Sequence, residues 1–280
     1  MPKVGKVGKV GMSLPFFEHG ARRMQEMVKP GMLCAFDFDG ALAPTVKEPH
    51  RASIPPSVLR RMITLSEYAR VAVVSGRSLA DVGVRLDFLA DFVLGNHGLE
   101  GLPGWEDNAG AYQALCLEWE RQLKPALADR VLFDSGIWLE NKTYSLSVHY
   151  RMSPDRAQAE QRLLQLFSAL TPCARVVPGH CVLNLLPADA PDKASALSRL
   201  FALSGAPSAI YVGDDATDEE LVALRRQGWL TVQVERSGES AAEFCLHHRL
   251  DVPELLDALV GQLGKARLPS RAAPQHAAAV

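Results

Sequence analysis

Four apolar runs, each ending in polar residues, recur along the chain and predict the strands of a parallel sheet. They cover residues 32–36, 71–74, 92–94 and 209–212. Amphipathic segments alternate with these runs, which is typical of a parallel sheet covered by helices on both faces. Strands buried on both faces are expected to be apolar at nearly every position, as these are. The pattern therefore predicts an α/β fold.

Residues 106–187 break this alternation and predict a small inserted α+β unit. Residues 137–151 predict two strands around Asn141, of which the second alternates apolar and polar positions and is expected to be half-buried. Ser153-Pro154 predicts the start of a helix, and two further short strands flank Pro178-Gly179-His180. A helix with an apolar stripe is expected before these strands, at Tyr112, Leu115, Cys116, Trp119 and Leu123.

The two ends of the chain differ from the part between them. Residues 2–11 hold three Lys-Val-Gly units and predict a flexible basic arm, whereas the far end is rich in Ala, Pro and Arg. The domain organisation that we predict is an N-terminal arm with a lead-in helix (1–29), a catalytic core (30–105 and 188–265), an inserted cap domain for substrate specificity (106–187) and a disordered tail (266–280).

Composition narrows the class of protein. The 280 residues are 48% hydrophobic and 22% charged, as in globular proteins, and the net charge of -2 provides no basic field for nucleic acid. No apolar run reaches the ~18 residues of a membrane span. Five scattered cysteines and an N-terminus without an apolar signal-peptide core predict reduced thiols and a cytoplasmic location. No feature of the sequence indicates an oligomeric state.

Asp37 and Asp39 carry the first chemical signal, because they follow the first apolar run directly. Residues two apart on an extended chain project from the same face, so the two carboxylates come close and repel each other unless a cation or a shared proton intervenes. The motif thus predicts a magnesium site or a pair of catalytic carboxyl groups. An ordinary Asp-Gly turn is the alternative.

Ser75-Gly76-Arg77 follows the second apolar run. Its hydroxyl, nearby backbone N–H groups and the N-terminus of a helix that Ser78 and Asp81 would cap could together bind an anion. Arg77 could add a charged donor. The alternative is that these residues only build a turn.

Acidic residues follow the last of the four runs, at Asp214, Asp215 and Asp218. They could complete an octahedral magnesium site with Asp37, because Mg²⁺ prefers oxygen ligands. Thr217 and Glu220 have the spacing of a capping box for the helix that follows. Lys193, at the start of another predicted helix, could hold a phosphoryl oxygen, although alone it would be an ordinary surface lysine.

The order of these motifs resembles that of the haloacid dehalogenase-like (HAD) phosphatases: Asp-x-Asp-Gly, Ser-Gly-Arg, Lys, then Gly-Asp-Asp-x-Thr-Asp. Residues 96–100, 140–142, 149–151 and 213–219 sharpen the resemblance to the trehalose-6-phosphate phosphatases. It extends over about residues 30–260. The resemblance implies a Rossmann-like HAD core with a parallel sheet and an inserted α+β cap domain.

The resemblance also implies an activity, the Mg²⁺-dependent hydrolysis of trehalose 6-phosphate to trehalose and phosphate, the last step of trehalose biosynthesis. Asp37 would attack phosphorus and form an aspartyl-phosphate, while Asp39 would act first as acid and then as base. Ser75 and Lys193 would bind the transferring phosphoryl group. The metal ligands implied are the Asp37 carboxylate, the Asp39 backbone carbonyl and Asp214, with Asp215 or Asp218 in support.

Sugar recognition is expected from the cap, since Glu140, Lys142 and Arg151 match family positions that bind sugar hydroxyls. Gly76, Arg77, His97 and Gly98 would line the crevice beside them. Two positions depart from the family pattern: Ala41 stands where a threonine is usual, and Asn184 stands where a glutamate is usual. The alternatives are a phosphatase of another sugar phosphate (sucrose phosphate or mannosyl-3-phosphoglycerate), a phosphomutase, and a catalytically silent sugar-phosphate sensor.

Overall fold

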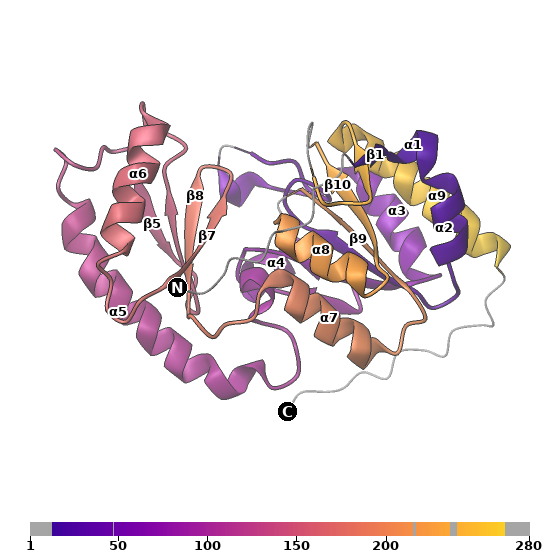
Figure 1. The fold of residues 1–280 in the computed structure, drawn as a ribbon, viewed down its shortest axis with the longest axis horizontal. Helices are drawn as coiled ribbons and strands as arrows, with labels where there is room; N and C mark the ends of the chain where they lie inside the picture. The colour runs from indigo at the N-terminus through magenta and orange to yellow at the C-terminus, as the bar shows by residue number, and fades with distance from the viewer. Residues whose placement is uncertain (1–12, 47, 215–216, 236–239, 267–280) are drawn as a thin grey trace, which may run out of the picture.

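The protein consists of two units, each built on its own sheet (Figure 1). A computed structural model describes residues 13–46, 48–214, 217–235 and 240–266. The larger unit contains a seven-stranded parallel sheet in the order β1-β11-β10-β9-β2-β3-β4. Its strands are β1 (Leu14–Pro15), β2 (Leu33–Asp37), β3 (Arg70–Val74), β4 (Phe92–Leu94), β9 (Ala209–Gly213), β10 (Leu230–Val234) and β11 (Phe244–Leu246).

The four predicted strands are confirmed as β2, β3, β4 and β9, and they lie next to one another in the sheet. Side chains alternate across β2, so that Cys34 and Phe36 face one hydrophobic cluster while Leu33 and Ala35 face the other. Burial on both faces explains the continuous apolar runs. The strands β1, β10 and β11 were not predicted.

Helices cover both faces of this sheet (Figure 1). One cluster brings α2, α3 and α9 against the sheet, and the other brings α7 and α8. The helices of the larger unit are α1 (Phe16–His19), α2 (Ala21–Met27), α3 (Pro56–Ser66), α4 (Leu79–Gly83), α7 (Lys193–Ser204), α8 (Asp218–Arg226) and α9 (Val252–Lys265). Short 3-10 turns lie at Pro49–Arg51, Asn96–Gly98, Trp105–Asn108 and Arg249–Asp251.

The smaller unit is a four-stranded antiparallel sheet in the order β5-β6-β8-β7, with two helices on one of its faces. Its strands are β5 (Trp138–Asn141), β6 (Leu146–His149), β7 (Arg175–Gly179) and β8 (Val182–Leu186), and its helices are α5 (Ala109–Leu127) and α6 (Arg156–Phe167). The predicted helical stripe lies on α5, where Cys116, Trp119 and Leu123 join the core of this unit. The inserted α+β unit is therefore confirmed in type, while its domain boundaries stay a prediction.

Two predictions of local structure are corrected. Helix α6 begins at Arg156, because Asp155 accepts from the N–H of Gln158 at 2.9 Å and is the cap, whereas Ser153 donates to Asp134. Strand β6 is buried on both faces rather than one, since Ser147 on its polar face is fully buried and donates to Asn184. The lead-in segment contains the helices α1 and α2 and also a strand, β1, which pairs with β11 at the sheet edge.

The basic arm at residues 2–11 and nearly all of the predicted tail lie outside the described residues. None of the helices in the described part of the chain is long and apolar enough to cross a membrane.

Candidate active site

The carboxyl ends of the central strands meet at a cavity between the two sheets. In the sheet register Asp37 of β2 lies opposite Val74 of β3, and Phe36 lies opposite Val212 of β9, so Asp37, Ser75 and Gly213 come side by side. The cavity has a volume of about 170 Å³, and Asp37, Asp39, Arg77 and Asp214 line its core side. Open parallel sheets bind their ligands at such strand ends.

Asp37 forms a buried ion pair with Lys193. Lys193 Nζ donates to Asp37 Oδ2 at 2.7 Å, and the two side chains are each only 3% exposed. The Tyr211 hydroxyl donates to the same oxygen at 3.0 Å. Two donors on one oxygen fix the plane of the carboxylate. Sequence reasoning missed Tyr211; the available signal was a phenol in the middle of a buried strand, where its hydroxyl needs a partner.

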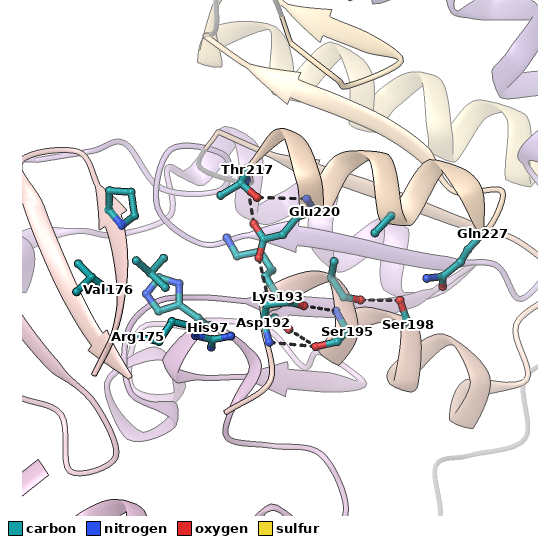
Figure 2. Close-up of a pocket in the computed structure, with 14 residues that line it drawn as sticks. His97, Arg175, Val176, Asp192, Lys193, Ser195, Ser198, Thr217, Glu220 and Gln227 are labelled. Carbon is teal, nitrogen blue, oxygen red and sulfur yellow. Dashed lines mark hydrogen bonds between the residues drawn. The ribbon is translucent and has the colours of Figure 1, made fainter. Parts of the chain in front are cut away.

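Lys193 is held in place through its backbone as well as its side chain. It opens α7, which Asp192 caps by accepting from the N–H of Ser195. The Lys193 N–H donates to Glu220 Oε1 at 3.0 Å, while Glu220 Oε2 accepts from the N–H of Thr217 at 2.9 Å (Figure 2). The predicted capping box of Thr217 and Glu220 is confirmed. Glu220 thus links the N-termini of α7 and α8.

The residues drawn in Figure 2 line a second cavity, which has a volume of about 540 Å³. It lies between β7 and the helices α7 and α8, and it shares His97 with the first cavity. Asp37, Asp39 and Asp214 line only the first cavity. The three carboxylates at the strand ends therefore converge on the smaller cavity.

Asp39 is paired with Arg77 across both of its carboxylate oxygens. Arg77 Nε and one terminal nitrogen donate to Asp39 at 2.7 and 2.8 Å, and the other terminal nitrogen donates to Asp81 at 2.8 Å. Burial disfavours the charge of Arg77, but the hydrogen bonds that Arg77 donates to Asp39 and Asp81 outweigh this effect and raise its pKa. Ser78 caps α4 by accepting from the N–H of Asp81, whereas the Asp81 side chain binds arginines instead of closing the predicted capping box.

Asp214 fits beside Asp37 because residue 40 is a glycine. Gly40 has φ +78, and a Cβ there would lie 1.9 Å from Asp214 Oδ2, so no side chain fits. The backbone of Asp214 is held by Gln233, whose Nε2 donates to the Asp214 carbonyl at 3.2 Å. Two carboxylates at adjacent strand ends are a donor set that suits a hard divalent cation. Asp215 lies outside the residues that the structure describes. Asp218 is the first residue of α8, and its side chain is likewise not described.

The predicted anion corner is compact and buried. Ser75 Oγ accepts from the N–H of Arg77 at 3.1 Å, and the Ser75 carbonyl accepts from the N–H of His97 at 2.9 Å. A Cβ at Gly76 would lie 2.6 Å from His97 Cε1, so the imidazole packs directly on that glycine. Gly98 packs closely on α7, because a Cβ added at residue 98 would lie 2.4 Å from the Cβ of Ala196. The turn after β3 (residues 75–77) and the turn after β4 (Asn96–Gly98) therefore pack directly on each other beside Asp37.

The predicted sugar-binding cations of the cap bind the larger unit in this structure. Lys142 Nζ donates to the Gly76 carbonyl at 2.8 Å, and Arg151 donates to the Val46 carbonyl at 2.7 Å. Burial lowers the pKa of Lys142, and the charge of nearby Glu140 opposes the shift. These bonds fasten the cap sheet over the cavity.

Glu140 and Asn184 lie on the cavity wall with partners of their own. Glu140 Oε2 is 2.7 Å from His149 Nε2; burial raises the pKa of Glu140, but His149 and Lys142 outweigh that effect and bring it below its usual value. Asn184 accepts from Ser147 Oγ at 2.6 Å and donates to the Val177 carbonyl at 3.1 Å. Its polar atoms are therefore bonded within the cap.

Sequence reasoning did not assign Asn96 or Trp138 to the site. Asn96 connects the two units, because its amide accepts from Ser145 Oγ and donates to the Lys142 carbonyl. Trp138 stacks on His149 and lines the cavity. Ala41, in contrast, points away from the site and is fully buried in the hydrophobic cluster around β2.

Comparisons with known proteins agree with this geometry. A family model described as trehalose-phosphatase matches residues 35–243. The trehalose-phosphate phosphatase of Mycobacterium tuberculosis is 29% identical over 245 residues, which cover 83% of this chain and 62% of that protein. The chain thus spans less than two thirds of the length of such curated relatives.

Solved structures share the core-plus-cap architecture. The C-terminal domain of Candida albicans trehalose-6-phosphate phosphatase superposes with a TM-score of 0.68 at 19% identity, covering 91% of this chain and 99% of that one. A trehalose-6-phosphate phosphatase related protein reaches 0.68 at 18% identity, covering 84% and 100%. The predicted HAD-like fold is confirmed, and, since the family model matches well over half of its length, the chain belongs to the trehalose-phosphatase family.

Proposed function

We propose that this protein is a Mg²⁺-dependent phosphatase that hydrolyses trehalose 6-phosphate to trehalose and phosphate. The observation that carries the proposal is the buried Asp37 carboxylate, oriented by Lys193 at 2.7 Å and Tyr211 at 3.0 Å, at the floor of a cavity with a polar cap wall. A carboxylate held rigidly in a concave site suits nucleophilic attack on phosphorus. Family membership adds the substrate class.

Two aspartates divide the proton and phosphoryl chemistry. Asp37 attacks phosphorus, and the bond from phosphorus to the sugar oxygen breaks as that oxygen takes a proton from Asp39. Asp39 then takes a proton from a water molecule that attacks the aspartyl-phosphate and releases Asp37 with inorganic phosphate. The substrate must exchange the Arg77 bonds of Asp39 for its own contacts, because both Asp39 oxygens face the guanidinium.

The residues that would hold Mg²⁺ are Asp37, Asp214 and the Asp39 backbone carbonyl, with Asp215 or Asp218 in support. The bound cation would offset negative charge on the phosphoryl oxygens. Lys193 and the Ser75 turn would bind the same group from the protein side. Positioning and charge stabilisation of this kind account for most of phosphoryl-transfer catalysis.

Sugar recognition is assigned to Glu140, Lys142 and Arg151 on the cap. Lys142 and Arg151 already donate to core carbonyls, so sugar hydroxyls would replace or extend bonds that are formed without substrate. Asn184 would contribute less than a carboxylate, because Ser147 and Val177 occupy its amide. The cytoplasmic location stays a prediction.

The test is release of inorganic phosphate from trehalose 6-phosphate with and without Mg²⁺. Asp37→Asn should lower kcat by at least about 10³-fold, the order expected when a nucleophile is removed. The exposed Asp107→Asn is the matched control and should keep full activity. Sucrose phosphate and mannosyl-3-phosphoglycerate, assayed in parallel, identify a different sugar. Turnover retained by Asp37→Asn contradicts the mechanism, and no release from any sugar phosphate favours a silent sensor.

A further inference from the structure

The cap sheet presents two rows of side chains to the cavity, and the strand register defines both. The inner row runs across the sheet through Glu140, Ser147, Asn184 and Val177. The outer row, two residues away along each strand, runs through Trp138, His149, Val182 and Gly179. Six of these eight residues line the catalytic cavity. The face therefore changes from polar to largely apolar and aromatic along the strands.

The inner row is the one nearer the catalytic aspartates. Lys142 continues β5 beyond Glu140 and reaches the Gly76 carbonyl of the core, so the strand runs toward the site from Trp138 through Glu140. Two residues of a strand advance by about 7 Å, so the outer row lies about 7 Å farther from the site than the inner row. A ring bonded to a phosphate at Asp37 and placed against the inner row would bring a second ring to the outer row.

Trp138 dominates the outer row and is held rigidly. Its ring stacks on His149 with 4.0 Å between centroids and an angle of 11° between planes. His149 is in turn 2.7 Å from Glu140, so the two rows are joined by one continuous set of contacts. Although Trp138 is fixed in this way, its side chain is 43% exposed. A rigid aromatic ring that stays open on a cavity wall is preorganised to bind a ligand.

We propose that Trp138, supported by His149, binds the second ring of a disaccharide phosphate and makes the enzyme prefer disaccharide over monosaccharide phosphates. The proposal deepens the function proposed above and rests on it. Apolar C–H groups on a sugar ring pack on an aromatic face, and the hydroxyls around the ring keep their water. A monosaccharide phosphate would fill only the inner row and would leave Trp138 in solvent.

The test compares Trp138→Ala with Trp138→Phe, which keeps an aromatic ring. Leu164→Ala is the matched control, because Leu164 is 44% exposed on α6 and lies outside the cavity. Trehalose 6-phosphate and glucose 6-phosphate are assayed with each protein. Trp138→Ala should raise KM for trehalose 6-phosphate about tenfold, with kcat and the constants for glucose 6-phosphate changed less than about twofold. Trp138→Phe should fall between it and the unchanged protein.

A second readout separates this proposal from the proposed activity. Binding of trehalose 6-phosphate to Asp37→Asn is measured by calorimetry and compared with the Asp37→Asn/Trp138→Ala double variant. Weaker binding by about tenfold supports the role of Trp138 even when no turnover is found. Equal losses for trehalose 6-phosphate and glucose 6-phosphate overturn the proposal, as does an unchanged affinity for both. If Trp138→Ala turns over trehalose 6-phosphate with the same kinetics as the unchanged protein, the proposed activity is supported and the proposed role of Trp138 is overturned.

Discussion

The buried pair of Lys193 and Asp37 predicts a large coupling in a double-mutant cycle of stability. At 2.7 Å and an effective dielectric constant of about 20, two unit charges attract each other by about 6 kcal/mol. Desolvation of both groups offsets much of this attraction. Lys193→Met or Asp37→Asn alone removes one charge and keeps the desolvation of the other, so each should lower the free energy of unfolding by about 3 kcal/mol. The double variant removes both charges and should recover at least about 2 kcal/mol of the summed loss.

The free energies of unfolding of the unchanged protein, the two single variants and the double variant are measured by urea denaturation. EDTA is present throughout, because a metal ion bound to Asp37 would compete with Lys193 for the carboxylate. The more exposed pair of Arg61 on α3 and Asp257 on α9, whose charged atoms are 2.8 Å apart, provides a control cycle in which solvent should leave a much smaller coupling. If the losses of Lys193→Met and Asp37→Asn simply add, then their attraction does not stabilise the fold and the reasoning is refuted.

Three further predictions concern the surroundings of the site. Glu220→Gln weakens the link between α7 and α8 and should lower kcat several-fold with little change in secondary structure. Kinetics and circular dichroism measure the two effects, and an unchanged kcat would mean that the link does not position Lys193 for the proposed reaction. Burial lowers the pKa of His149 below its usual 6.5 despite its bond to Glu140, so the unfolded state binds more protons and stability falls as the pH drops below about 6.5. His149→Gln should therefore lose less thermal stability between pH 7 and 5 than the unchanged protein, and an equal loss would contradict the assignment. Burial raises the pKa of Cys116 to about 12 and raises that of Cys34 as well, whereas Cys173 is exposed. Iodoacetamide should therefore label Cys173 in the folded protein, and Cys34 and Cys116 only after unfolding. Mass spectrometry of the labelled protein measures this pattern, and labelling of Cys34 in the folded protein would contradict it.

The strand ends were predictable because parallel strands place their carboxyl ends at one edge of the sheet. The positions of Asp37, Ser75 and Asp214 follow from apolar runs that stop at polar residues, and the structure brings all three to one end of the sheet. The helix that Lys193 opens was also visible, from Pro191-Asp192 before it. Local periodicity was sufficient for these features, since each depends on a short stretch of chain.

Strand β1 and the start of α6 were not predictable by the same means. Strand β1 has only two residues, so it offers too few positions for a period to be recognised. At the start of α6, Ser153 and Asp155 are both acceptable caps in sequence. The bond from Ser153 to Asp134, nineteen residues away, leaves Asp155 to cap the helix.

The sequence by itself determined which chemical groups stand at the strand ends, and in what order, because local alternation and helix caps depend on neighbouring residues. Only the tertiary structure decided which groups meet. Lys193 reaches Asp37 across 156 positions, Arg77 binds both oxygens of Asp39, and Trp138 stacks on His149 of the next strand. Such contacts depend on strand register, on the crossing of helices over the sheet and on the closeness that glycines such as Gly40 permit. These are properties of packing between distant segments, and no short stretch of sequence contains them.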